Sequence, residues 1–182
     1  MKKCLTLVFA LIISACTSLE VVELDPNTGY FPGEKRATVT KAIKMDLDIE
    51  KPLVLVPTGD FTSKMVDNIG YFDRVITFED LEKIIIKNDL TDKVAPIDSR
   101  IGINQAAKAY KKFLWVRWDT RKEGSKIYKQ LMLTDPISLE DIFICETHYD
   151  LVWAGVNDQN NWYPMMNSLI DYISDNSPTY GK

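Results

Sequence analysis

The sequence predicts an α+β domain over residues 38–182, with a mixed β-sheet, an antiparallel C-terminal meander and about four packing helices. Two observations carry this prediction. Short apolar runs alternate with stretches of helical periodicity in the first half of the chain. Three strand-like segments then follow one another closely after residue 112. Strands joined by so few residues pair antiparallel, because a parallel crossover needs a dozen residues or more.

The first half of the domain alternates predicted strands and helices. Apolar side chains alternate over 43–49, which is typical of a half-buried strand, and residues 53–56 are apolar on both faces, as in a central strand. Thr62 or Ser63 is expected to cap a helix, and the acids at 79–80 suit the first turn of the next one. In chain order, the predicted elements are strands over 38–49, 53–56 and 74–78 and helices over 62–72, 79–85 and 103–111.

The second half is expected to form the meander and a closing helix. Asn160 or Asn161 is predicted to cap that helix, with Pro164 in its first turn, where proline is tolerated. The predicted strands cover 113–118, 127–134 and 142–153, with a hairpin turn at 122–125.

The chain begins in the order of a secretory signal peptide, with Met1-Lys2-Lys3 followed by an apolar run over 5–13. This run is about half the length needed to span a bilayer, which takes ~20 apolar residues. Its ending, Ile13-Ser14-Ala15-Cys16, resembles the lipobox of bacterial lipoproteins, in which the cysteine is lipidated and becomes the first mature residue. The resemblance implies a signal over 1–15, an acyl anchor such as palmitate on Cys16, and attachment to a membrane. An ordinary cleaved signal, which would leave a soluble exported protein, is the alternative.

The resemblance also implies a location in the bacterial cell envelope. Thr17 stands where inner-membrane retention uses Asp, which favours an outer-membrane lipoprotein facing the periplasm. Residues 16–37 are rich in turn-forming residues, so they are predicted to be a flexible tether with an r.m.s. span of roughly 25 Å. Packing of part of the tether on the domain, such as Val21 to Leu24, is the alternative.

Charge and cysteine content exclude several classes of protein. Cleavage after residue 15 removes Lys2 and Lys3 and no acid, which leaves 20 basic and 26 acidic side chains and a net charge of −6. A chain with this charge lacks the basic surface of a nucleic-acid-binding protein. Once Cys4 has left with the signal and Cys16 carries lipid, Cys145 has no partner for a disulfide. No metal site and no cofactor are predicted, and Cys145 is expected to be a buried, inert thiol.

Glu146, His148 and Asp150 alternate on the last predicted strand and therefore share one face of it. Such an acid–histidine–acid row could bind a metal or hold a general base. Nothing nearby in the sequence completes a nucleophile or a three-ligand metal set, which favours a solvated strand face over an active site. No catalytic residue is assigned.

The residues around the last loop form the second candidate site. Aromatic side chains stand there beside amide side chains, which can bind hydroxyl groups. This surface is predicted to contact a ligand or a partner protein through Trp153, Asn157, Asp158, Gln159, Asn160, Trp162 and Tyr163. Core packing explains most of the aromatic residues equally well.

Residues 131–138, Leu-Met-Leu-Thr-Asp-Pro-Ile-Ser, join two predicted strands ahead of the closing helix. Through this strand–turn arrangement, residues 113–172 resemble small periplasmic lipoprotein domains of the TolB amino-terminal-domain-like kind. Those domains carry a glycine in the turn, where this chain has residues 139–141. The resemblance implies a non-enzymatic envelope protein that docks onto a larger assembly. The predicted function is therefore a membrane-anchored, non-catalytic binding or accessory lipoprotein with a protein partner. An exported hydrolase or metal-dependent enzyme centred on His148, and a small-ligand-binding lipoprotein, are the alternatives.

Overall fold

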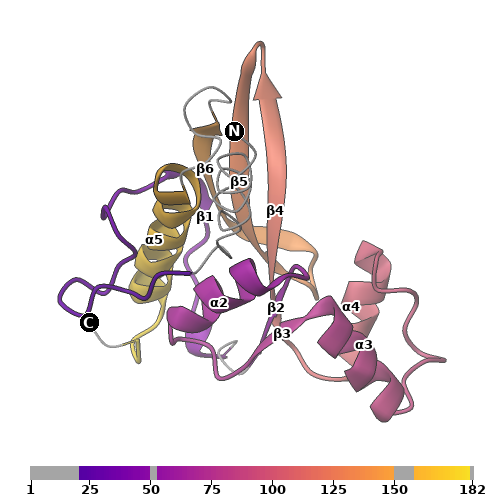
Figure 1. The fold of residues 1–182 in the computed structure, drawn as a ribbon. Helices are drawn as coiled ribbons and strands as arrows, with labels where there is room; N and C mark the ends of the chain where they lie inside the picture. Colours follow the sequence, from indigo (N-terminus) through magenta and orange to yellow (C-terminus); the bar gives the residue numbers. More distant parts are fainter. Residues whose placement is uncertain (1–20, 50–52, 150–157, 181–182) are drawn as a thin grey trace, which may run out of the picture.

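The computed structural model describes residues 21–49, 53–149 and 158–180, which form one six-stranded mixed sheet with helices on both faces (Figure 1). The strand order is β1-β6-β5-β4-β2-β3. The strands are β1 (Thr38–Ala42), β2 (Val54–Val56), β3 (Val75–Thr77), β4 (Leu114–Glu123), β5 (Lys126–Asp135) and β6 (Glu140–Tyr149). The helices are η1 (Leu47–Ile49, a 3-10 helix), α2 (Asp60–Asn68), α3 (Phe78–Lys87), α4 (Arg100–Ala109) and α5 (Asp158–Asn176). The predicted fold class is confirmed.

The sheet is antiparallel on one side and parallel on the other. Strands β4, β5 and β6 pair antiparallel as the predicted meander, and β1 adds to β6, also antiparallel. Strands β4, β2 and β3 are parallel and are joined through helices. The β4–β5 turn lies at Gly124, whose φ of 59° suits glycine, and this hairpin projects from the body of the molecule (Figure 1).

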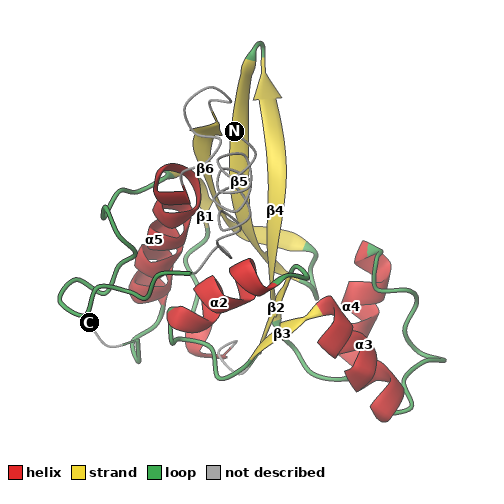
Figure 2. Cartoon of the chain, viewed as in Figure 1, coloured by secondary structure: helices red, strands yellow, loops and turns green. Residues whose placement is uncertain are grey.

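Two hydrophobic cores lie on opposite faces of the sheet. Figure 2 shows the helices that cover them, with α3 and α4 together and apart from α2 and α5. The larger core packs α2 and α5 against side chains such as Leu131, Leu133 and Cys145. The smaller core lies under α3 and α4 at the parallel side, around Leu55 and Phe113. Thr77 and Asp80 form a capping box at the start of α3, as the acids at 79–80 suggested. No helix among the described residues is long and apolar enough to cross a bilayer.

Residues 21–37 pack along α5, so the expected flexible tether is wrong for this segment. Phe31 is fully buried and stacks on Tyr163, with 5.2 Å between ring centroids. The buried Asn167 accepts from the Phe31 amide at 2.8 Å and donates to the Phe31 and Lys35 carbonyls, both at 3.2 Å. We call residues 21–37 the N-terminal strap. Its turn-forming residues let the segment follow the surface of α5. The alternative of partial packing is correct: Val21 and Leu24 pack against the larger core, and Tyr30, Phe31 and Ala37 add further contacts, while residues 25–29 and 33–36 are exposed.

Several predicted element boundaries differ from the structure. The strand expected over 38–49 ends at Ala42, and the apolar residues after it diverge: Leu47 is buried, whereas Ile49 is 71% exposed. Helix α2 begins at Asp60, ahead of the predicted Thr62 or Ser63 cap. Helix α5 begins at Asp158, which places Pro164 beyond the first turn. The β6 strand ends at Tyr149, and residues 150–157 lie outside the described part of the chain.

Truncation of the strap's aromatic anchor tests this packing. Replacing Phe31 with alanine is expected to cost about 3–5 kcal/mol of unfolding free energy, because it empties a buried ring site. The measurement is urea denaturation of the full chain. Val22→Ala is the matched control, since Val22 belongs to the same segment but is 47% exposed, and it should cost less than about 1 kcal/mol. A flexible tether would make the two variants equally stable.

Candidate functional site

Two arginine–carboxylate pairs cross the meander on the face opposite α5. Each pair joins an arginine on β4 to an acid on β6 over a polar residue of β5. Arg117 donates to Asp141 at 2.6 Å and to Thr134 at 3.0 Å, and the Thr134 hydroxyl donates to Asp141 at 2.6 Å. The meander brings these three residues together although they are far apart in sequence. The first pair is therefore a closed network.

The second pair involves Glu146, one of the sequence-predicted polar residues. Its carboxylate accepts two bonds from Arg121, at 2.6 and 2.9 Å, and one from Gln130 at 2.8 Å. The Glu146 side chain is only 7% exposed. The hydrogen bonds from Arg121 outweigh the effect of burial and lower the pKa of Glu146. Glu146 is therefore an ionised carboxylate at neutral pH rather than a proton donor. The expectation that Glu146 lies on a solvated face is wrong.

His148 lies two residues farther along the same face and is exposed. Its ring packs edge-on against Tyr128, at 5.5 Å between centroids, and the Arg121 guanidinium covers the same Tyr128 ring at 4.3 Å. Glu146 and His148 lie near one another, but the Glu146 carboxylate is hydrogen-bonded to Arg121. Asp150 lies outside the described residues. No group of three potential metal ligands occurs within the described ranges.

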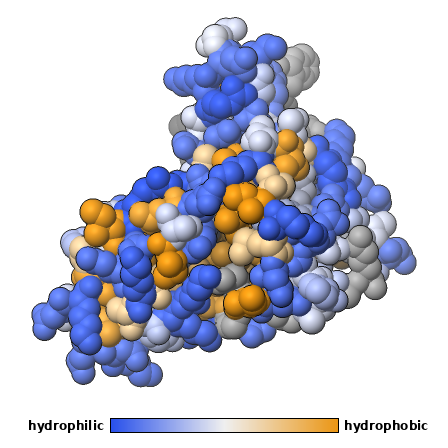
Figure 3. Space-filling model, turned by 180° about the vertical axis from the view of Figure 1, so that it is seen from behind, coloured by the Kyte–Doolittle hydropathy of each residue, from blue (hydrophilic) through white to orange (hydrophobic). Residues whose placement is uncertain are grey.

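Arg121 and Gln130 were missed by the sequence analysis. The only available signal was the alternation within β4 and β5, which places residues 117, 119 and 121 on one face of β4 and residues 128, 130 and 132 on one face of β5. The register that sets Gln130 opposite Glu146 depends on the length of the β5–β6 turn and on the irregularity between Leu133 and Thr134. From behind, apolar side chains are scattered among hydrophilic ones, and the projecting hairpin is hydrophilic (Figure 3).

The second predicted surface, around the last loop, is largely core or lies outside the described residues. Asn161 and Tyr163 are each 3% exposed, so the prediction that Tyr163 contacts a partner is wrong. Trp162 is half-buried and packs edge-on against Trp118 at 4.7 Å. The helical spacing of Trp162, Met166, Leu169 and Ile173 already indicated core packing. Trp153 and Asn157 lie outside the described residues, and only the backbone of Asp158, Gln159 and Asn160 is described, at the start of α5.

Cys145 is fully buried and its sulfur lies 3.6 Å from the Met165 carbonyl oxygen. Burial raises the pKa of this thiol, which therefore stays protonated and unreactive at neutral pH. Cys145 is thus a core residue, as expected. Cys16 lies outside the described residues.

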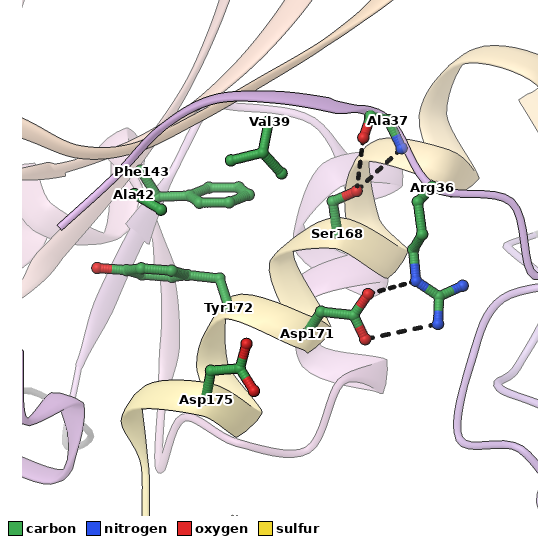
Figure 4. Close-up of a pocket in the computed structure, with 9 residues that line it drawn as sticks. All are labelled: Arg36, Ala37, Val39, Ala42, Phe143, Ser168, Asp171, Tyr172 and Asp175. Atoms are coloured by element: carbon green, nitrogen blue, oxygen red, sulfur yellow. Dashed lines mark hydrogen bonds and ion pairs between the residues drawn. The ribbon is translucent and has the colours of Figure 1, made fainter. Parts of the chain in front are cut away.

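A groove runs between β1 and the C-terminal half of α5 (Figure 4). It has a volume of about 280 Å³, and its floor contains Phe143 and Tyr172, whose rings stack at 4.7 Å. Val39, 48% exposed, contributes from β1. Along its α5 wall stand Asp171 and Asp175, one helical turn apart.

The two aspartates of this groove differ in their partners. Asp171 is held by Arg36 of the N-terminal strap, and the Tyr30 hydroxyl donates to it at 2.6 Å. The Asp175 side chain is exposed, and within the described residues its carboxylate has neither an ion pair nor a hydrogen bond. The sequence analysis missed both residues. Their one signal was acidic residues close to the C-terminal end of a helix, where the helix dipole disfavours negative charge.

Comparison of the chain with protein-family models, curated proteins and solved structures found no match. The expected kinship with TolB-like domains therefore stays a prediction.

The Glu146–Arg121 pair predicts a pH-dependent cost of mutation. Because its folded-state pKa is lowered, Glu146 contributes stability above its unfolded pKa of about 4.3, and that contribution is lost as the pH falls through the folded value. Glu146→Gln should therefore destabilise the protein by about 1–2 kcal/mol at pH 7, because one partner of a largely buried pair loses its charge. The difference between variant and wild type should shrink towards pH 3, where wild-type Glu146 becomes neutral.

Urea denaturation at pH 7, 5 and 3 measures this difference. Glu82→Gln, an exposed change on α3, is the control and should change the unfolding free energy by less than about 0.5 kcal/mol. A Glu146→Gln cost that is constant from pH 7 to pH 3 would contradict the assignment.

Proposed function

We propose that this protein is a membrane-anchored, non-catalytic binding lipoprotein of the bacterial cell envelope, lipidated on Cys16. The groove beside β1 is the observation that carries the binding role, because it combines an aromatic floor with an unpaired carboxylate. Pockets that bind ligands commonly combine apolar walls with a few polar groups in this way. The anchor rests on the lipobox sequence.

The meander face supports binding rather than catalysis. Arg117, Arg121, Asp141 and Glu146 are satisfied by one another and by Thr134 and Gln130. A general base has to be free to take a proton from a substrate, and Glu146 is committed to a guanidinium. The enzyme alternative would thus have to rely on His148 without Glu146.

The groove also lies close to the proposed anchor along the chain. Arg36 and Ala37, at the end of the N-terminal strap, line it. The strap therefore connects the Cys16 side of the chain directly to the proposed binding edge. This arrangement favours a partner protein in or near the membrane, an accessory role consistent with the predicted envelope assembly.

Replacement of the lipidated residue tests the anchor. Cys16→Ser is expected to abolish incorporation of labelled palmitate and to move the protein out of the membrane fraction, because no thiol remains for the lipid. The measurements are metabolic labelling and cell fractionation. Cys4→Ser is the matched control, since Cys4 belongs to the segment removed with the signal, and it should leave labelling and fractionation unchanged. Labelling that survives Cys16→Ser would refute the anchor.

A further inference from the structure

The groove beside β1 continues past the hollow shown in Figure 4. A second hollow of about 280 Å³ and a third of about 320 Å³ follow along α5, and each shares lining residues with the one before it. Ala42 and Tyr172 line the first and second hollows, and Lys44 and Asn176 line the second and third. Asp175 lines all three. Together they form one elongated depression, which we call the α5 groove.

The shape of the α5 groove suits an extended chain. One wall is the segment from Arg36 to Asp46, which includes β1, and the other is the C-terminal half of α5. Strand β1 alone extends about 17 Å, the length of five extended residues. It is also the edge strand of the sheet, so no described strand covers its outer side.

The α5 groove carries a small excess of negative charge, since Asp46, Asp171 and Asp175 line it against Arg36 and Lys44. Arg36 neutralises Asp171, whereas the carboxylate of Asp175 has no described partner. Lys44 lies in the second and third hollows and donates to the backbone oxygen of Asp175, and Asp46 adds a further acid to the third hollow. The last turn of α5 contains no basic residue of its own, and Lys44 of the facing segment supplies the cation at its Asp175 carbonyl.

We propose that the α5 groove binds an extended segment of a partner protein that carries lysine or arginine between apolar residues. The basic side chain would pair with Asp175, and apolar neighbours would cover Val39 and the Phe143–Tyr172 floor. Side chains two residues apart in an extended segment point the same way, so one face of the partner can supply both kinds of contact. This assignment rests on the proposed binding function and names its partner chemistry.

Two other occupants fit the surface less well. Anionic lipid headgroups would meet like charge at Asp175 and at the C-terminal end of α5. A second copy pairing edge to edge along β1 would meet the bulge between Val39 and Lys41 and the charge of Lys41, devices that discourage such pairing.

Synthetic peptides test this partner chemistry directly. The probe is a labelled, end-blocked heptapeptide, Val-Lys-Val-Lys-Val-Lys-Val, titrated against the full-length protein purified in a nonionic detergent and followed by fluorescence anisotropy. Asp175→Asn should weaken binding about 3–5-fold, the size expected for one partly exposed charge pair. Asp92→Asn, the same change at an exposed site outside the groove, should weaken binding less than 1.5-fold. Replacing the valines of the probe with serine should also weaken binding, as should replacing its lysines with glutamate.

Three results would overturn the proposal. Equal weakening by Asp175→Asn and Asp92→Asn would show that the peptide senses only overall charge. Undiminished affinity of the serine probe would remove the apolar contacts. Concentration-dependent self-association of the protein, lost in Asp175→Asn on sedimentation, would assign the groove to a second copy of the chain. None of these results depends on lipidation, so they are separable from a failure of the Cys16→Ser experiment.

Discussion

Helix α5 is buried around almost its whole circumference, and the rest of the structure depends on this burial. One side packs on the sheet, where Met165 meets Cys145. The opposite side is covered by the N-terminal strap, with Phe31 stacked on Tyr163 and the backbone of Phe31 bonded to Asn167. A helix enclosed in this way needs apolar or internally bonded residues on every face, which explains the buried Asn167 and Ser168. The edge of α5 that carries Asp171 and Asp175 reaches solvent beside β1.

On the meander face, the alternating residues of one strand suggest a catalytic or metal-binding site, but an ion pair with another strand of the meander occupies a side chain that such a site would need. In the sequence, Glu146 and His148 have the spacing of a catalytic or metal-binding row. In the fold, β5 lies between β4 and β6, and the Arg121 side chain of β4 reaches across β5 to Glu146 on β6. Two such arginine–acid pairs tie three strands together, with Arg117 and Arg121 also stacked near Trp115 and Tyr128. Because buried carboxylates are stable only when paired, the pairing is a condition for placing Glu146 there at all.

The fold class could be predicted from the sequence because it depends on local patterns. Each of the signals used lies within about ten residues of sequence. They are the apolar run over 53–56, the acids at the start of α3 and the close spacing of the meander strands. The N-terminal strap could not be predicted in the same way, since its partners Asn167 and Ser168 lie more than 130 residues away in sequence. The groove could not be predicted for the same reason, because its two walls are about 130 residues apart in sequence, as in the Tyr172–Ile43 hydrogen bond. A dense run of turn formers is equally compatible with a free linker and with a chain that follows a helix surface.

The N-terminal strap also limits how far the domain could travel from a membrane. If Cys16 is lipidated as proposed, the chain from Cys16 to Val21, the first described residue, can span at most about 18 Å. A free linker of about twenty residues would let the domain explore a hemisphere with a radius of tens of ångströms. The shorter connection would confine the domain to a thin layer at the bilayer surface and raise its effective concentration towards anything held in that layer. It would also prevent the domain from reaching partners deep in the aqueous space. Only proteins close to the membrane surface could then become its partners.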